Sequence, residues 1–255
     1  MRILMTAVLA LALGSPLSAA AKPEPAGVIT TVSGKVTLFS APLAKDAAPS
    51  AKSIAAGQPV YAGDRIKTGA NGRVALVLAD GTQLKVNYSS DITLKGKDSK
   101  GRSSSRGIAA IGILVGDLWA KVTKKDSTLE FDTPAAVAAV KGTEPIIGVT
   151  PDGTTCVQLR NGEVLLTNEQ DGSATLDPNQ QICIAKGQAI SKSMVQPWTA
   201  KAVQTWDQAF TQATNASVVV TYKNAAGAEK TFTLNYAPGA ASPTAQGATT
   251  PAAGK

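Results

Sequence analysis

Apolar residues alternate with less apolar ones along short stretches of this chain, most clearly between residues 74 and 86. The aliphatic residues at every second position there are Val74, Leu76, Leu78, Leu84 and Val86. A period of two is typical of a strand with one buried face. Asp80-Gly81 separates the two runs, and such a pair suits a hairpin turn that needs two residues with positive φ. The segment therefore predicts a β-hairpin.

Other Asx-Gly pairs punctuate the chain in the same way. They are Asn71-Gly72, Asp152-Gly153, Asn161-Gly162 and Asp171-Gly172. Short apolar runs between such turns, without a long helical period, predict an all-β domain built as a sandwich, a barrel or a solenoid-like coil. The shared parity from Val28 to Leu38 predicts an opening strand, or a hairpin broken at Ser33-Gly34. The Ala-, Pro- and Lys-rich stretch 41–56 predicts an exposed excursion.

The pattern changes to helical spacing after Gln196. Apolar side chains recur at Trp198, Ala202, Trp206 and Phe210. Residues 199–213 are therefore predicted to form a short amphipathic helix, whose stripe either packs on the β core or binds a partner or a membrane surface. Packing is favoured, because docking a short helix requires one such stripe. Residues 196–236 are predicted to contain this helix and a β-hairpin that follows it. The low-complexity stretch 237–255 is predicted to be disordered.

The N-terminal residues 1–21 have the features of a secretory signal peptide. Arg2 precedes an apolar run from Ile3 to Leu13, and small residues reach Ala21. An uncleaved anchor is the disfavoured alternative, because a spanning helix needs about 20 apolar residues. The sequence thus predicts cleavage after Ala21, a periplasmic or secreted protein, and no integral membrane span.

The amino-acid composition limits which classes of binding partner are expected. Of the 255 residues 44% are hydrophobic, which is enough for a substantial core, and 25 Lys and Arg against 18 Asp and Glu give a formal charge of +7. Aromatic residues are only 4% of the chain and no nucleic-acid motif is present, so no nucleic-acid partner is predicted. The loop from Lys95 to Arg106 is basic and has two interpretations, a contact with an anionic envelope polymer or, as favoured, a solvated loop.

The predicted export determines how the two cysteines are interpreted. An oxidising envelope favours their pairing. In one predicted strand the apolar face holds Val157 and Leu159, and in the other it holds Ile182 and Ile184. Cys156 and Cys183 therefore both point away from the apolar face. We therefore predict a disulfide between Cys156 and Cys183. The alternative, a reactive thiol, would need a nearby base or a CxxC partner, and neither is visible in the sequence.

Candidate catalytic chemistry is sparse. The chain has no histidine, which excludes Ser-His-Asp and Cys-His systems and imidazole zinc sites. Carboxylates that could pair for glycoside hydrolysis are Asp64, Asp80, Asp117, Asp132, Glu144 and Glu163. A glycosidase needs two of them about 5 to 10 Å apart, whereas most of these lie beside glycine in turns. The sequence predicts no enzyme, no cofactor and no metal site.

An ordered series of segments resembles the FecR-type domain of bacterial envelope signalling proteins. The series is AGDRIKTG, RVALVLADGTQLKV, ILVGDLWAKV, FDTPAAVAAVKGT and DGTTCVQLRNGEVLLTN. Its most specific part runs from Thr133-Pro134 to Gly142-Thr143. The resemblance places the β domain at residues 27–195, with a core at 57–188. Where the family usually has an aromatic or aliphatic residue, this chain has Glu144-Pro145, so the next strand is predicted to begin later or to lie at an edge.

The resemblance implies a coiled or solenoid-like all-β domain that works by contact with other proteins. In the best-known members it receives a signal from an outer-membrane transporter and is joined to a cytoplasmic anti-sigma segment. The predicted signal peptide stands in place of that segment, so the anti-sigma role is not expected to carry over. We predict an exported, non-catalytic protein-interaction module in envelope sensing or assembly. A binder of cell-surface polysaccharide is the alternative, with anionic polysaccharide as its partner.

Overall fold

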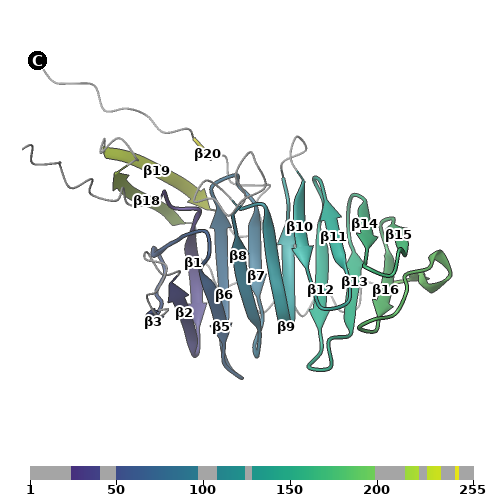
Figure 1. Ribbon diagram of the computed structural model, residues 1–255. Coiled ribbons are helices and arrows are strands. Elements are labelled where there is room, and N and C mark those ends of the chain that lie inside the picture. The colour runs from purple at the N-terminus through teal and green to yellow at the C-terminus, as the bar shows by residue number, and fades with distance from the viewer. Residues whose placement is uncertain are drawn as a thin grey trace, which may run out of the picture.

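The fold is built almost entirely from β-strands (Figure 1). The computed structural model describes residues 24–40, 50–96, 108–123, 128–198, 216–223, 229–236 and 245–246. Within these residues the only helical element is the short 3-10 turn η1 (Lys192–Met194), and no helix is long and apolar enough to cross a membrane. The predicted all-β class is confirmed.

Two sheets share one strand. Sheet A contains, in spatial order, β4 (Pro59–Val60), β1 (Gly27–Ser33), β6 (Arg73–Leu78), β7 (Gln83–Val86), β9 (Ala110–Lys121), β12 (Pro145–Val149), β13 (Thr155–Leu159), β16 (Gln180–Ile184) and β17 (Gln196–Pro197). Sheet B contains β3 (Ser50–Ser53), β2 (Val36–Ser40), β5 (Arg65–Thr68), β8 (Asp91–Lys95), β9, β10 (Leu129–Asp132), β11 (Val137–Val140), β14 (Val164–Thr167) and β15 (Ser173–Leu176).

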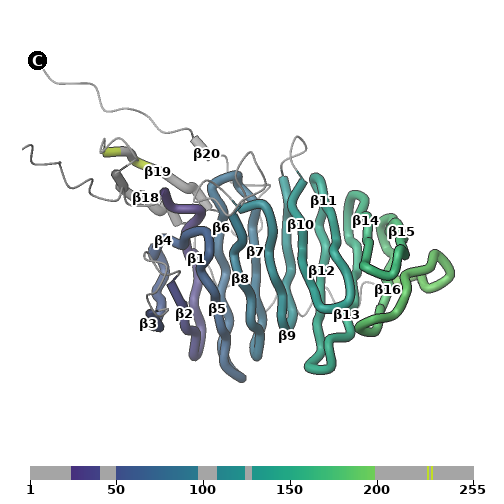
Figure 2. Tube along the Cα trace, viewed as in Figure 1, coloured from purple at the N-terminus to yellow at the C-terminus, as the bar shows by residue number. Residues whose placement is uncertain are grey.

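The chain passes back and forth between the sheets as it advances from one end of the molecule to the other (Figure 2). A regular solenoid would stack parallel strands, whereas β9–β10 is the only parallel pair among the described strands. Side chains from both sheets meet in one core, which includes Ile66 and Phe131 of sheet B and Leu84 and Ile147 of sheet A, all fully buried. The period of two in each strand supplies these inward side chains.

Strand β9 belongs to both sheets because it bends at Gly116. Its first half pairs with β8 and β10 in sheet B, and its second half pairs with β7 and β12 in sheet A. Gly116 has a φ of +97°, and a Cβ there would overlap the backbone and side chain of Ser90. A residue without a side chain is therefore required where the strand changes sheets.

The predicted hairpin between residues 74 and 86 is confirmed, with Val74 opposite Val86 and Leu76 opposite Leu84. Its turn differs from the expectation of two residues with positive φ, because only Gly81 adopts one, at +86°. The Gly81 amide donates to the Leu78 carbonyl at 2.9 Å. This arrangement is a type I turn followed by a glycine bulge, the usual geometry of a three-residue hairpin loop.

Two predictions about strand placement are wrong. Strands β1 and β2 form neither one strand nor a hairpin, because the turn at Gly34 (φ +65°) sends β2 into sheet B while β1 pairs with β6 in sheet A. Strand β12 begins at Pro145 itself and lies between β9 and β13. Proline is tolerated there because, as the first strand residue, it removes only one donor from the end of a ladder.

The C-terminal hairpin is confirmed as β18 (Ala216–Lys223) paired with β19 (Glu229–Tyr236). Strand β20 (Ala245–Gln246) adds to β19 and falls within the stretch 237–255 that was predicted to be disordered. The predicted signal peptide and helix, and the basic loop beyond residue 96, lie outside the described residues.

Candidate functional site

Three of the carboxylates considered for glycoside hydrolysis have separate structural partners. Asp64 is buried, and its Oδ2 accepts a hydrogen bond from the Tyr61 amide at 2.9 Å. Burial, and then the Asp64 charge, raise the pKa of Tyr61. Asp132 forms a 2.6 Å ion pair with Lys95. Asp80 caps its own hairpin turn. Asp64 and Asp80 therefore hold turns, and Asp132 links β10 to β8 across β9.

Glu144 has its place on the outer face of sheet A. Its Oε1 accepts hydrogen bonds from Trp119 Nε1 at 3.2 Å and from Arg160 Nη1 at 3.0 Å. Lys85 lies over the Trp119 ring, 4.5 Å from its centroid. The carboxylate predicted as a catalytic candidate therefore fixes an aromatic side chain, which packs with Ile146 and Trp198.

Three further carboxylates, Asp117, Glu163 and Glu130, lie on or beside the strands. Asp117 is half-buried on β9, and burial raises its pKa. Its Oδ1 lies over Gly148, 2.8 Å from where a Cβ would stand. Glu163 is exposed and Glu130 is half-buried on β10. Among the described residues, no group of three His, Cys, Asp or Glu side chains could hold a metal ion.

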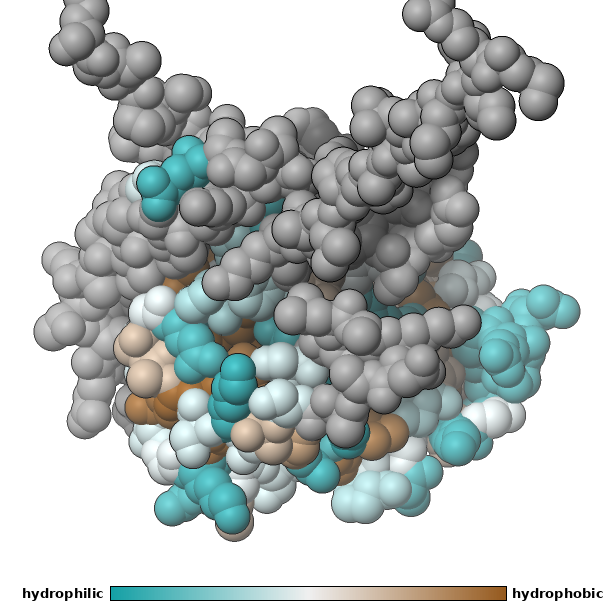
Figure 3. All heavy atoms as spheres, turned by 60° about the vertical axis from the view of Figure 1, so that its left-hand side comes forward, coloured by the Kyte–Doolittle hydropathy of each residue, from teal (hydrophilic) through white to brown (hydrophobic). Residues whose placement is uncertain are grey.

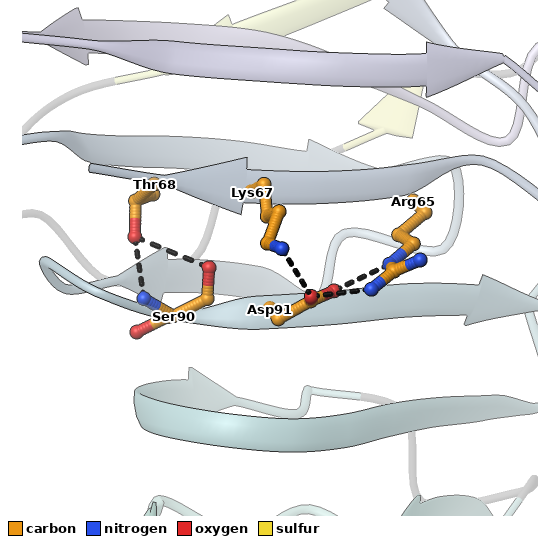
Figure 4. Close-up of polar contacts among 5 residues, drawn as sticks. All are labelled: Arg65, Lys67, Thr68, Ser90 and Asp91. Carbon is orange, nitrogen blue, oxygen red and sulfur yellow. Dashed lines mark hydrogen bonds and ion pairs between the residues drawn. The ribbon is translucent and has the colours of Figure 1, made fainter. Parts of the chain in front are cut away.

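A polar cluster that the sequence analysis missed links β5 to β8 on the outer face of sheet B (Figure 4). Asp91 is almost fully buried and accepts two hydrogen bonds from Arg65, from Nε at 2.6 Å and from Nη2 at 2.5 Å. Lys67 Nζ lies 3.4 Å from the same carboxylate. Paired, bidentate geometry of this kind is strong. We call Arg65, Lys67 and Asp91 the charged staple.

Buried hydroxyls extend this link toward β9. The Ser90 amide donates to Thr68 Oγ1 at 2.8 Å (Figure 4). Thr68 Oγ1 in turn donates to the Asn87 carbonyl at 2.6 Å. The Asp117 amide donates to Ser90 Oγ at 3.0 Å. Because the Ser90 hydroxyl is buried and bonded to backbone groups, it serves the strand crossing and lacks the neighbouring base that a nucleophile needs.

The predicted motif residues lie at two turns beside β11. Thr133 Oγ1 donates to the Ala136 carbonyl at 2.6 Å and accepts from the Ala136 amide at 3.1 Å, which closes the β10–β11 turn. Gly142 has a φ of +59°. Thr143 is buried, and a Cβ at Gly162 would come within 2.6 Å of its methyl group. The motif therefore shapes the rim between the sheets.

An open groove lies beside this motif, and we call it the rim groove. It has a volume of about 590 Å³ and is lined by residues 133–137, 167–170 and 186–187. Ala135 and Ala136 are buried and form part of the core. Asn168 Nδ2 donates to the carbonyl of Gln188, which directly follows the lining segment 186–187, at 2.6 Å. The volume falls in the range of small-molecule ligand sites.

Residues 64–175 match the family model described as FecR protein. This part of the chain is a FecR-type domain. The resemblance stated from the segment series is thereby confirmed, and Thr133, Pro134, Gly142 and Thr143 fall within the matched residues.

Solved structures similar to this chain include two crystal structures, at 1.65 and 2.50 Å resolution, of a proposed anti-sigma factor from Parabacteroides distasonis. Each is 18% identical, has a TM-score of 0.45, and matches 56% of this chain and 63% of that one. This chain thus spans less than two thirds of either neighbour. No curated protein matches the chain.

The sheets of the FecR-type domain are completed by strands outside the matched residues. Strand β1 pairs with β6, and β16 pairs with β13. The predicted disulfide lies in this second pair, where Cys156 faces Cys183 with their Cα atoms 4.1 Å apart. Both cysteines point away from the core as predicted, and the disulfide is confirmed.

The surface at the N-terminal end of the FecR-type domain is mixed. Apolar and polar side chains are interspersed among the described residues on the face shown in Figure 3. Arg65 and Lys67 could have been singled out from the sequence as two cations on one strand face. Their carboxylate, Asp91, is 26 residues from Arg65, and no local pattern links them.

Proposed function

We propose that this chain is an exported, non-catalytic protein-interaction module that acts in bacterial envelope sensing or assembly. The observation that carries the proposal is the FecR-type domain at residues 64–175, whose most specific motif contributes residues 133–137 to the lining of the rim groove. The best-known members of the family signal by contact with other proteins, which favours binding as the function. Several of the candidate carboxylates are bonded to structural partners, which argues against a catalytic role for them. The rim groove is the proposed contact site.

Site-specific photocrosslinking in intact cells tests this proposal. A photoreactive residue at Lys186, in the rim groove, is expected to capture a defined envelope protein. The same residue at Leu114, which is 60% exposed on the outer face of sheet B, serves as the matched control. Identical products at both positions would contradict a binding site in the groove. Capture of glycan at Lys186 in place of protein would favour the polysaccharide binder.

Export through a cleaved signal peptide is part of the same proposal. The apolar run and small residues before Lys22 support cleavage there. Intact mass spectrometry of the protein isolated from the cell envelope is expected to give a mature chain beginning within a few residues of Lys22. A species that retains Met1 would contradict export by cleavage.

A further inference from the structure

The disulfide lies outside the core, near the C-terminal edge of sheet A. Cys156 and Cys183 occupy the outer face, and Cys183 is exposed. Their neighbours along each strand, such as Val157 and Ile182, are buried in the core. Cys183 therefore lies on a face that a partner can approach, and exposed disulfides are more labile than buried structural ones.

The strand pair around the disulfide has its own support. Five residue pairs align β13 with β16, from Thr155–Ile184 to Leu159–Gln180. Inward side chains of both strands are buried with 0 or 1% exposure, including Leu159 and Ile184. Because backbone pairing and apolar burial hold the strands together, breaking the S–S bond is expected to leave this region folded.

Access to Cys183 is open from the sheet edge. Strand β17 pairs only with Gln180 and Gln181, so it ends before reaching Cys183. A groove of about 350 Å³ continues from there and is lined by Gln181, Ile182 and Cys183 on one side and by η1 and Gln196 on the other.

The opposite flank of the disulfide is different. Gly148 lies directly across from Cys156 on β12, and Oδ1 of Asp117 on β9 lies over this glycine. The disulfide therefore has an open groove beside Cys183, whereas a carboxylate lies over the residue beside Cys156. Rates of thiol–disulfide exchange depend on this kind of access and on which sulfur is attacked.

We propose that Cys156–Cys183 is a thiol–disulfide exchange site for a protein dithiol, with Cys183 Sγ as the attacked atom. The incoming thiolate forms a bond to Cys183 Sγ while the S–S bond breaks, and Cys156 leaves as a thiolate that takes a proton from water. The second thiol of the partner, as thiolate, then attacks the mixed disulfide. Cys183 is released as a thiolate and protonated, two electrons pass to this protein, and the partner dithiol becomes a disulfide.

A trapping experiment tests the attacked atom. The probe is thioredoxin with its second active-site cysteine replaced by serine, mixed with the full chain without denaturant. The expected product is a mixed disulfide on Cys183, located by peptide mass spectrometry, whose far-ultraviolet circular dichroism equals the sum of the spectra of the two separate proteins. A product on Cys156, or one that forms only at the rate of global unfolding, would overturn the proposal.

A groove-filling variant tests the route of approach. Ser193→Trp places a bulky side chain in the groove beside Cys183 and is expected to slow trapping at least about tenfold, because exchange depends on access to the sulfur. Leu114→Trp, on the exposed outer face of sheet B, is the matched control and should react like the parent. Unchanged trapping in Ser193→Trp would overturn approach through this groove.

Discussion

The two halves of the sandwich are tied across their strands by different chemistry. Before β9, the charged staple joins β5 to β8 through a carboxylate whose side chain is 3% exposed. After β9, the disulfide joins β13 to β16 on an open face. Both ties link strands from the outer side of a sheet, so the difference between them is one of burial and bond type.

This difference separates what the fold requires from what it can expose to chemistry. A buried carboxylate depends on its cations, because removing one partner leaves a charge without compensation. The strands on either side of the disulfide are already held by buried aliphatic residues. The first half therefore uses its tie for structure, whereas the second half has one that can open while its strands stay paired.

Substitution at the boundary between the halves is expected to have the largest effect. Gly116→Val places a branched side chain at φ +97° and against Ser90, and should lower the free energy of unfolding by about 3 kcal/mol or more. Both halves should lose stability together in urea unfolding, because β9 serves both. Gly112→Ala is the control, since the nearest atom to its Cβ is the flexible end of Lys95. Equal stability of both variants would refute this account.

Removal of the covalent tie should come next. Replacing both Cys156 and Cys183 by serine is expected to lower the free energy of unfolding by about 3 kcal/mol, through the added freedom of the unfolded chain. The folded state should keep its near-ultraviolet circular dichroism, because the core beneath is unchanged. Loss of native structure without denaturant would show that the disulfide is needed for the fold.

Weakening the charged staple should be slightly less costly. Asp91→Asn removes the charge that two cations share and is expected to destabilise the protein by about 2 kcal/mol. Lys95→Ala is the control. Lys95 forms an ion pair with Asp132 in which the two side chains are 47% and 35% exposed, and this pair should contribute about 0.5 kcal/mol. Thermal unfolding of both variants measures the difference. An equal loss in both would remove the distinction between buried and exposed pairs.

The smallest effect should come from a carboxyl group that lacks the partners of Asp91. Burial raises the pKa of Asp117 in the folded state, and no described residue donates a side-chain hydrogen bond to it. Stability associated with this group is thus fully present below its unfolded value of 3.8 and is lost as pH rises through the folded pKa. Asp117→Asn should be more stable than the parent at neutral pH, with the gain vanishing in acid. A constant difference across pH would contradict the assignment.

Period-two alternation predicted which side chains enter the core, but it could not say which strands are neighbours. Val157 and Ile182 were correctly placed inward, and this phase also predicted the outward disulfide. The staple depends on register, since Lys67 lies opposite Asp91 only after β5 and β8 pair. Register between distant strands is set by the whole sheet, and a local pattern does not contain it.

Turn dipeptides were similarly informative about position but not about conformation. Gly153 and Gly162 adopt positive φ as expected for Asx-Gly pairs. At Asp171-Gly172 the positive φ belongs to Asp171, at 54°, while a Cβ at Gly172 would overlap Ile190. The second glycine thus serves close packing. Such a contact with a distant segment, like the rim groove, is visible only in the folded chain.

Strand β9 has a consequence for the order in which the molecule opens. Its twelve residues supply rungs to both sheets, so neither half can complete its ladders until this strand is in register. Local fraying at the outer strands leaves β9 flanked on both sides. Its amide protons are therefore expected to exchange with deuterium among the slowest in the protein, and only when the whole sandwich opens.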